Sequence, residues 1–88
     1  MKLDQALIDR MIELAKLYGA TRLILFGSAL NNPEKAKDID LACDIPGWDF
    51  FAYGAKLEDE FLIPIDLVPL TPPNPFTEHI ESIGKRLL

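Results

Sequence analysis

Residues 23–44 read LILFGSALNNPEKAKDIDLACD, and this stretch decides the fold of the chain. The apolar run at the start of this stretch, extended by the two residues before it, predicts a buried strand over residues 21–26. Gly27 predicts a tight turn at the end of that strand. A polar loop follows over residues 31–37. The end of the stretch largely alternates polar and apolar side chains, which predicts a half-buried strand over residues 38–44.

The second decisive stretch is residues 63–70, IPIDLVPL, which predicts a third strand. Pro64 and Pro69 cannot donate backbone hydrogen bonds, so they favour an edge position or bulges for this strand. Beyond a rigid proline-rich turn, Asn74 is suited to cap a last helix with Pro75 at its first position. Spacings of three and four give this helix a predicted core-facing stripe: Phe76, Ile80, Ile83 and Leu87.

Two further helices are predicted from amphipathic spacing. Residues 3–18 carry one apolar stripe that ends at Gly19, a residue suited to a helix C-terminus. Residues 48–61 repeat apolar side chains in the same way, although Gly54 weakens this helix. The order of elements predicts an α/β or α+β fold, a small mixed sheet flanked by helices. With 88 residues, the chain has room for one domain, residues 1–88.

Composition narrows the possible functions. Fourteen acidic residues against nine Lys plus Arg give a net charge of −5, which disfavours stable nucleic-acid binding. The absence of a long apolar run and of a signal-peptide pattern predicts a cytoplasmic protein that does not enter membranes. Cys43 is the only cysteine, so we expect any metal to have oxygen ligands. His79, the only histidine, is expected on a helix surface without a catalytic role.

Three aspartates are candidates for chemistry. Asp38 and Asp40 stand two residues apart on a predicted strand and point to one face, where their repulsion is relieved if both bind a hard cation such as Mg²⁺. Asp66 interrupts an apolar run, where an unpaired carboxylate is costly to desolvate. If the strands are neighbours, the three carboxylates can surround one or two metal ions, as in phosphoryl transfer. The alternative is that all three are ordinary solvent-facing strand residues.

The Gly27-Ser28 turn follows the first strand directly. A glycine at this place permits a sharp turn and a close approach of the backbone to a ligand. The following N–H groups and the Ser28 hydroxyl can point at a phosphate. A Gly-Ser pair is also common in plain turns, so its meaning depends on the aspartates that follow.

Taken together, the strand, the Gly-Ser turn, the DxD strand and the third strand with its Asp resemble the minimal nucleotidyltransferases of the DNA polymerase beta superfamily over about residues 21–70. The resemblance implies an enzyme that transfers a nucleoside monophosphate, in the first place AMP from ATP, to an acceptor hydroxyl. It implies that Gly27 and Ser28 bind the triphosphate. It also implies a set of catalytic Mg²⁺ ligands: Asp38, Asp40 and Asp66.

The resemblance also bears on partners, because stand-alone minimal domains of that family often pair with a helical HEPN protein, a toxin with RNase activity. An antitoxin that modifies such a toxin is the implied role. The sequence departs from the family at Ala29 and Leu30, where an arginine or another polar residue is common, and the nine residues between Ser28 and Asp38 make a spacing one residue shorter than usual. The alternative function is a catalytically weak module that neutralises its partner by contact.

Overall fold

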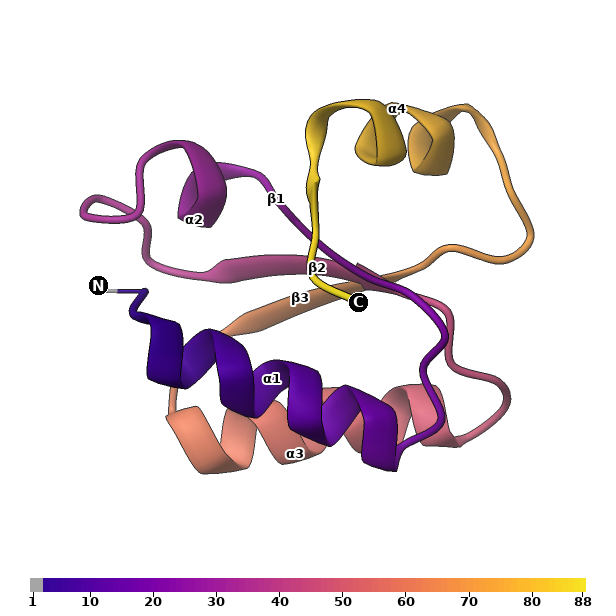
Figure 1. The fold of residues 1–88 in the computed structure, drawn as a ribbon, viewed down its shortest axis with the longest axis horizontal. Helices are drawn as coiled ribbons and strands as arrows, with labels where there is room; N and C mark the ends of the chain where they lie inside the picture. The colour runs from indigo at the N-terminus through magenta and orange to yellow at the C-terminus, as the bar shows by residue number, and fades with distance from the viewer. Residues whose placement is uncertain (1–2) are drawn as a thin grey trace.

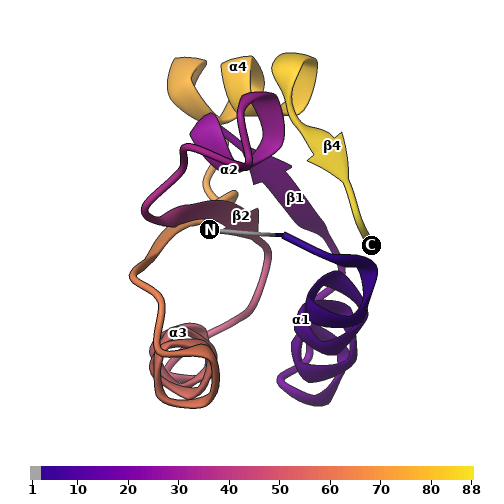
Figure 2. The same ribbon diagram turned by 90° about the vertical axis from the view of Figure 1, so that its left-hand side faces the viewer.

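The computed structural model describes residues 3–88 and consists of one four-stranded sheet with helices on both faces (Figures 1 and 2). The strands lie in the order β3-β2-β1-β4; β2 and β3 are parallel, and the other pairs are antiparallel. The sheet is therefore mixed and flanked by helices, as predicted. The elements in chain order are α1 Gln5–Leu17, β1 Leu23–Phe26, α2 Ser28–Asn31, β2 Ile39–Cys43, α3 Asp49–Phe61, β3 Ile65–Pro69, α4 Pro75–Ile83 and β4 Lys85–Arg86.

Helices α1 and α3 lie side by side on one face of the sheet and enclose the larger core (Figure 2). Each helix buries the apolar stripe that its sequence predicted, with Met11 and Leu57 fully buried. Tyr53 of α3 is also fully buried, and its hydroxyl donates a hydrogen bond of 2.9 Å to the carbonyl of Met11 in α1. This bond satisfies a polar group that would otherwise be costly to bury.

Helix α4 covers the other face, over a smaller core around Ile24, Phe26 and Ile80. Its start agrees with the prediction, because the Asn74 side chain accepts a hydrogen bond from the Thr77 N–H and Pro75 is the first helical residue. The prediction that the apolar stripe of this helix faces the core is wrong in part. Ile80 is buried, but 54% of Phe76 and 49% of Ile83 are exposed. Helix α4 packs mainly on β1, and only Thr77 and Ile80 of this helix are buried.

Two short elements, α2 and β4, were not predicted from the sequence. The first turn after Gly27 is helical and forms α2, while the chain end returns to β1 and forms β4. Gly54, which weakened the prediction of α3, lies where a Cβ would come within 3.3 Å of the Leu67 side chain, so its small size allows close packing of α3 on β3. Of the helices within residues 3–88, none is long and apolar enough to cross a membrane.

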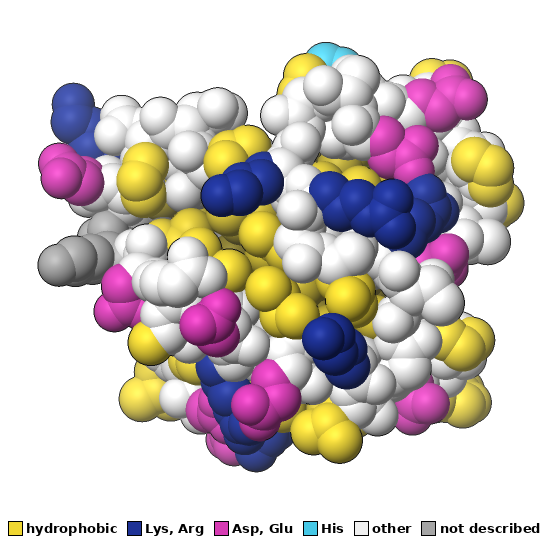
Figure 3. All heavy atoms as spheres, viewed as in Figure 1, with side chains coloured by type: hydrophobic (Ala, Val, Ile, Leu, Met, Phe, Trp, Pro, Cys, Tyr) yellow, Lys and Arg dark blue, Asp and Glu magenta, His cyan; other side chains and the backbone are white. Residues whose placement is uncertain are grey.

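Surface charge is unevenly placed. Basic side chains lie across the middle of the face that carries α1 and the β4 edge (Figure 3). Lys85 and Arg86 of β4 are exposed, and Arg22, just before β1, makes ion pairs with Glu81 of α4 and Asp44 after β2. Strand β3 forms the opposite edge of the sheet, away from these basic residues.

Candidate functional site

Two of the candidate aspartates lie side by side in the sheet. Strands β2 and β3 pair in parallel with Asp40 directly opposite Asp66. Side chains at matched positions of neighbouring strands point to the same face. Asp38 lies in the bend just before β2, close enough for its charge to act on Asp40. The structure thus brings together two residues that are 26 positions apart in sequence.

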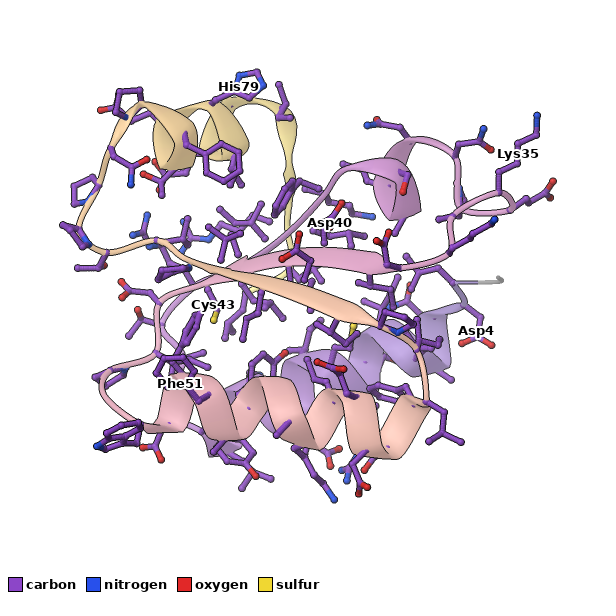
Figure 4. All side chains as sticks on the ribbon, turned by 180° about the vertical axis from the view of Figure 1, so that it is seen from behind. Asp4, Lys35, Asp40, Cys43, Phe51 and His79 are labelled. Atoms are coloured by element: carbon purple, nitrogen blue, oxygen red, sulfur yellow. The ribbon has the colours of Figure 1, made fainter. Side chains whose placement is uncertain are left out.

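Asp40 and Asp66 lie on the face opposite α1 and α3. Ile39 and Leu41, which flank Asp40, are completely buried in the core beneath those two helices. Figure 4 shows Asp40 on the far side of the sheet from α3, whereas Cys43 lies on the α3 side. Burial among apolar groups raises the pKa of the Cys43 thiol to about 12, so this cysteine is a neutral core residue.

Negative charge is concentrated around Asp40. Its carboxylate is half-buried. Burial raises its pKa above the usual value, the charges of Asp38 and Asp66 raise it further, and a side-chain hydrogen bond with Asp66 acts in the same direction. A bound cation would stabilise the ionised carboxylates, because its positive charge offsets their mutual repulsion.

Gly27 closes over this carboxylate from the end of β1. Its φ of 73° and ψ of −154° are a backbone conformation that side chains rarely allow. A Cβ atom at this residue would lie 2.2 Å from Oδ2 of Asp40. The Gly27 carbonyl accepts hydrogen bonds of 3.1 Å from the backbone N–H of Leu30, from that of Asn31 and from the Asn31 side chain. These bonds start α2 at Ser28, which is exposed.

The residues present fit a hard divalent cation. Mg²⁺ prefers carboxylate oxygens, and Asp40 and Asp66 offer them on one face, with the charge of Asp38 nearby. Because Gly27 has no side chain, its backbone can lie directly against Oδ2 of Asp40. Across residues 3–88, no group of three or more His, Cys, Asp or Glu side chains is already arranged to hold a metal ion. The three carboxylates would therefore have to draw closer around a bound cation.

Lys35 and His79 lie away from Asp40. Lys35 lies on the loop after α2 and points outward, and His79 lies on the outer surface of α4 (Figure 4). Lys37 is exposed. His79 is exposed on its helix, as its sequence position predicted.

A groove between α3 and β3 was not predicted. It has a volume of about 440 Å³ and reaches Asp66. The ring of Phe51, at its α3 side, is 64% exposed and contacts the rings of Trp48 and Phe50 at centroid distances of 5.8 Å and 5.3 Å. Only the pairing of distant segments creates this groove, so local periodicity carried no signal for it. The residues that line it are Phe50, Phe51, Gly54, Ala55, Glu58, Ile65, Asp66 and Leu67.

Comparison with known proteins identifies the fold. No protein-family model and no curated protein sequence matches the chain. Among solved structures, it is similar to the toxin–antitoxin complex MntA-HepT, with a TM-score of 0.73 and 21% identity over 97% of this chain and 72% of that chain. A toxin–antitoxin structure with AMP-PNP gives a TM-score of 0.75 and 21% identity over 92% and 72%.

A third similar structure contains a tri-AMPylated HEPN toxin from Shewanella oneidensis in complex with an MNT antitoxin. Its TM-score is 0.73, with 20% identity over 98% of this chain and 72% of that chain. The protein therefore has a nucleotidyltransferase fold. In particular, its fold resembles that in the solved complexes of MNT antitoxins with HEPN toxins, in agreement with the resemblance in sequence.

Proposed function

We propose that this protein is a Mg²⁺-dependent nucleotidyltransferase that moves a nucleoside monophosphate, in the first place AMP from ATP, to an acceptor hydroxyl. The observation that carries the proposal is the direct register of Asp40 with Asp66, where the backbone of Gly27 lies against the Asp40 carboxylate. The shared fold adds support, since one similar structure holds AMP-PNP and another an AMPylated toxin.

Each residue has a separate part in this reaction. Asp38 and Asp40 would hold the cation, which neutralises phosphate charge and orients the triphosphate when it is bound. Gly27 and Ser28 offer backbone groups and a hydroxyl to the phosphates at the end of β1. Asp66 is exposed on the edge strand and is therefore accessible to an incoming acceptor. The acceptor oxygen bonds to the α-phosphorus, the bond to pyrophosphate breaks, and the hydroxyl proton passes to Asp66.

The proposed acceptor belongs to a HEPN-domain toxin, which the protein would inactivate as an antitoxin. The solved structures that share the fold are complexes of this kind. Residues 3–88 form a single sheet with its covering helices, and in this proposal a protein partner presents the hydroxyl.

Transfer of a radioactive label from ATP to the partner tests the proposal. The protein is incubated with ATP carrying ³²P at the α-position, Mg²⁺ and the co-encoded HEPN protein, and label on the partner is measured after denaturing electrophoresis. We expect label with the wild type and none with Asp40→Asn. Absence of label with folded wild-type protein, or equal label with Asp40→Asn, would contradict the proposal.

A second candidate is neutralisation by contact alone. It is favoured by the residues after Ser28: Ala29 is 1% exposed and Leu30 packs against the core, so neither offers phosphate a polar side chain. On this alternative, Asp40→Asn would still suppress RNA cleavage by the toxin as fully as the wild type. A variant that fails to suppress cleavage although it still binds the toxin would instead support catalysis.

A further inference from the structure

Strand β3 has an open side. Among residues 3–88 it pairs with β2 only, so its other side faces solvent. The N–H of Ile39 in β2 donates to the Pro64 carbonyl at 3.0 Å, where the pairing begins. In a parallel pair successive residues turn their backbone groups to alternate sides. The N–H groups of Ile65 and Leu67 therefore point away from β2.

Pro69 limits this open edge at one end, because it occupies the next outward-facing position after Leu67 and has no N–H to offer. At the other end, β3 begins at Ile65, directly after Pro64, whose carbonyl faces β2. The outward-facing N–H groups of β3 are therefore confined to residues 65–67, a window centred on Asp66. A proline on an edge strand limits uncontrolled pairing, and Pro69 leaves free the part beside the candidate site.

The groove between α3 and β3 lies along the same window. Ile65 and Leu67 are half-buried and form its sheet wall, and exposed Phe51 stands on its α3 side. Asp66 lies between those two strand residues and points to the opposite face of the sheet, toward Asp40. An added strand would send its side chains alternately into the groove and toward the aspartates.

The negative charge near the β3 edge favours a basic binding partner. The aspartates on one face and Glu58 in the groove make the β3 edge acidic, whereas basic residues gather at the β4 edge (Figure 3). A guest strand that carries basic residues on the side facing the aspartates is complementary to this edge. The other side of the guest strand would carry aliphatic or aromatic side chains, which fit the apolar groove.

We propose that β3 is the docking edge for an extended segment of the partner protein, which pairs with Ile65 and Leu67, places apolar side chains in the α3–β3 groove and presents its acceptor hydroxyl to Asp66. The identity of the hydroxyl as acceptor rests on the proposed function, whereas the docking of the strand does not. This mode of binding supplies an acceptor site without an additional domain.

A short synthetic peptide tests the docking. The probe is capped Lys-Val-Ser-Val-Lys, whose hydroxyl and basic side chains fall on one face of a strand and whose valines fall on the other. It is titrated into ¹⁵N-labelled protein without nucleotide. We expect the largest amide shifts at Ile65 and Leu67. The same composition ordered Lys-Lys-Ser-Val-Val, or the first peptide with its backbone nitrogens methylated, should bind at least about tenfold more weakly, because pairing or alternation is lost.

Two neutral substitutions on α3 form a matched pair. Ala55 and Ala52 are both exposed, but only Ala55 lines the groove. Ala55→Gln should weaken binding of the peptide about tenfold, because a polar side chain then occupies the groove. Ala52→Gln should leave the affinity within about twofold of the wild type, as surface substitutions usually do. Equal effects of both substitutions would overturn the inference.

The remaining outcomes separate docking from catalysis. If the peptide binds as expected to wild type and to Asp40→Asn but no nucleotide is transferred to any partner, docking stands and the proposed function fails. If the partner is labelled while the peptide leaves Ile65 and Leu67 unshifted and Ala55→Gln transfers normally, the docking inference is wrong. Shifts at these amides that grow with protein concentration alone would assign the edge to a second copy of the chain and would also overturn the proposal.

Discussion

Gly27 lies so close to Asp40 that a Cβ atom on the glycine would stand 2.2 Å from the carboxylate oxygen Oδ2. The two residues are linked through the sheet, because Phe26, which precedes Gly27, pairs with Asp40 across the antiparallel β1–β2 ladder. The end of β1 is thereby held over the carboxylate that carries the proposed metal. Backbone conformation and lack of space both require glycine at this place.

Replacement of Gly27 by alanine should therefore destabilise the protein more than its backbone strain alone explains. Gly19 provides the control, since its φ of 88° is similar and nothing lies within 4 Å of its Cβ position. We expect Gly19→Ala to cost roughly 1 kcal/mol and Gly27→Ala at least about 1 kcal/mol more, because of the added clash. Urea denaturation measures both free energies of unfolding. Equal losses would mean that Asp40 moves aside freely.

Asp40→Asn should make the metal-free protein more stable at pH 7. The pKa of Asp40 is raised in the folded state by burial and by the charges of Asp38 and Asp66, so its ionisation opposes folding. This penalty is absent below the pKa of the unfolded chain and develops as the pH rises through the folded-state value. The gain from the substitution should accordingly shrink on acidification, when urea midpoints are compared at pH 7 and pH 4 in EDTA.

The same substitution should abolish most nucleotidyl transfer, by roughly 100-fold or more, since a carboxylate ligand is lost. Asp59→Asn on the exposed surface of α3 removes one charge far from β2 and serves as the control for both measurements. Stability and activity should move in opposite directions for Asp40→Asn only. Unfolding of this variant would instead identify Asp40 as a structural residue.

Mg²⁺ and ATP together should stabilise the folded protein by mass action. At a ligand concentration about ten times Kd, binding adds about 1.4 kcal/mol to the free energy of unfolding. For a domain of this size, Tm should rise by roughly 5 to 10 °C in differential scanning fluorimetry. The rise should be lost when Asp38 and Asp40 are both replaced by Asn. No rise in the wild type at millimolar ligand would argue for an inactive site.

Tyr53→Phe should destabilise the protein by about 1 to 2 kcal/mol, because the Met11 carbonyl in the core loses its hydrogen-bond donor. Tyr18, whose ring lies 6.0 Å from that of Tyr53, is the matched control. Within residues 3–88 its hydroxyl makes no such bond, so Tyr18→Phe should be close to neutral. Chemical denaturation distinguishes the two. Equal values would show that the hydroxyl of Tyr53 contributes nothing beyond packing.

Local features of the fold follow from the sequence alone. The alternation around Asp40 placed Ile39 and Leu41 in the core and the carboxylate on the other face, because side-chain direction in a strand depends only on neighbouring residues. The cap at Asn74 was predictable because its side chain accepts a hydrogen bond from an N–H close to it in sequence. The edge position of β3 was predictable because a proline lacks the N–H that an inner strand needs.

Only the tertiary structure decided how the distant parts meet. The register of Asp40 with Asp66 and the fit of Gly27 against Asp40 depend on the order and stagger of strands, which arise when segments far apart in sequence bury a common core. The groove beside β3 has the same origin. Periodicity also misplaced Phe76 and Ile83, since it shows that a helix has an apolar face but not how much of that face the rest of the chain covers.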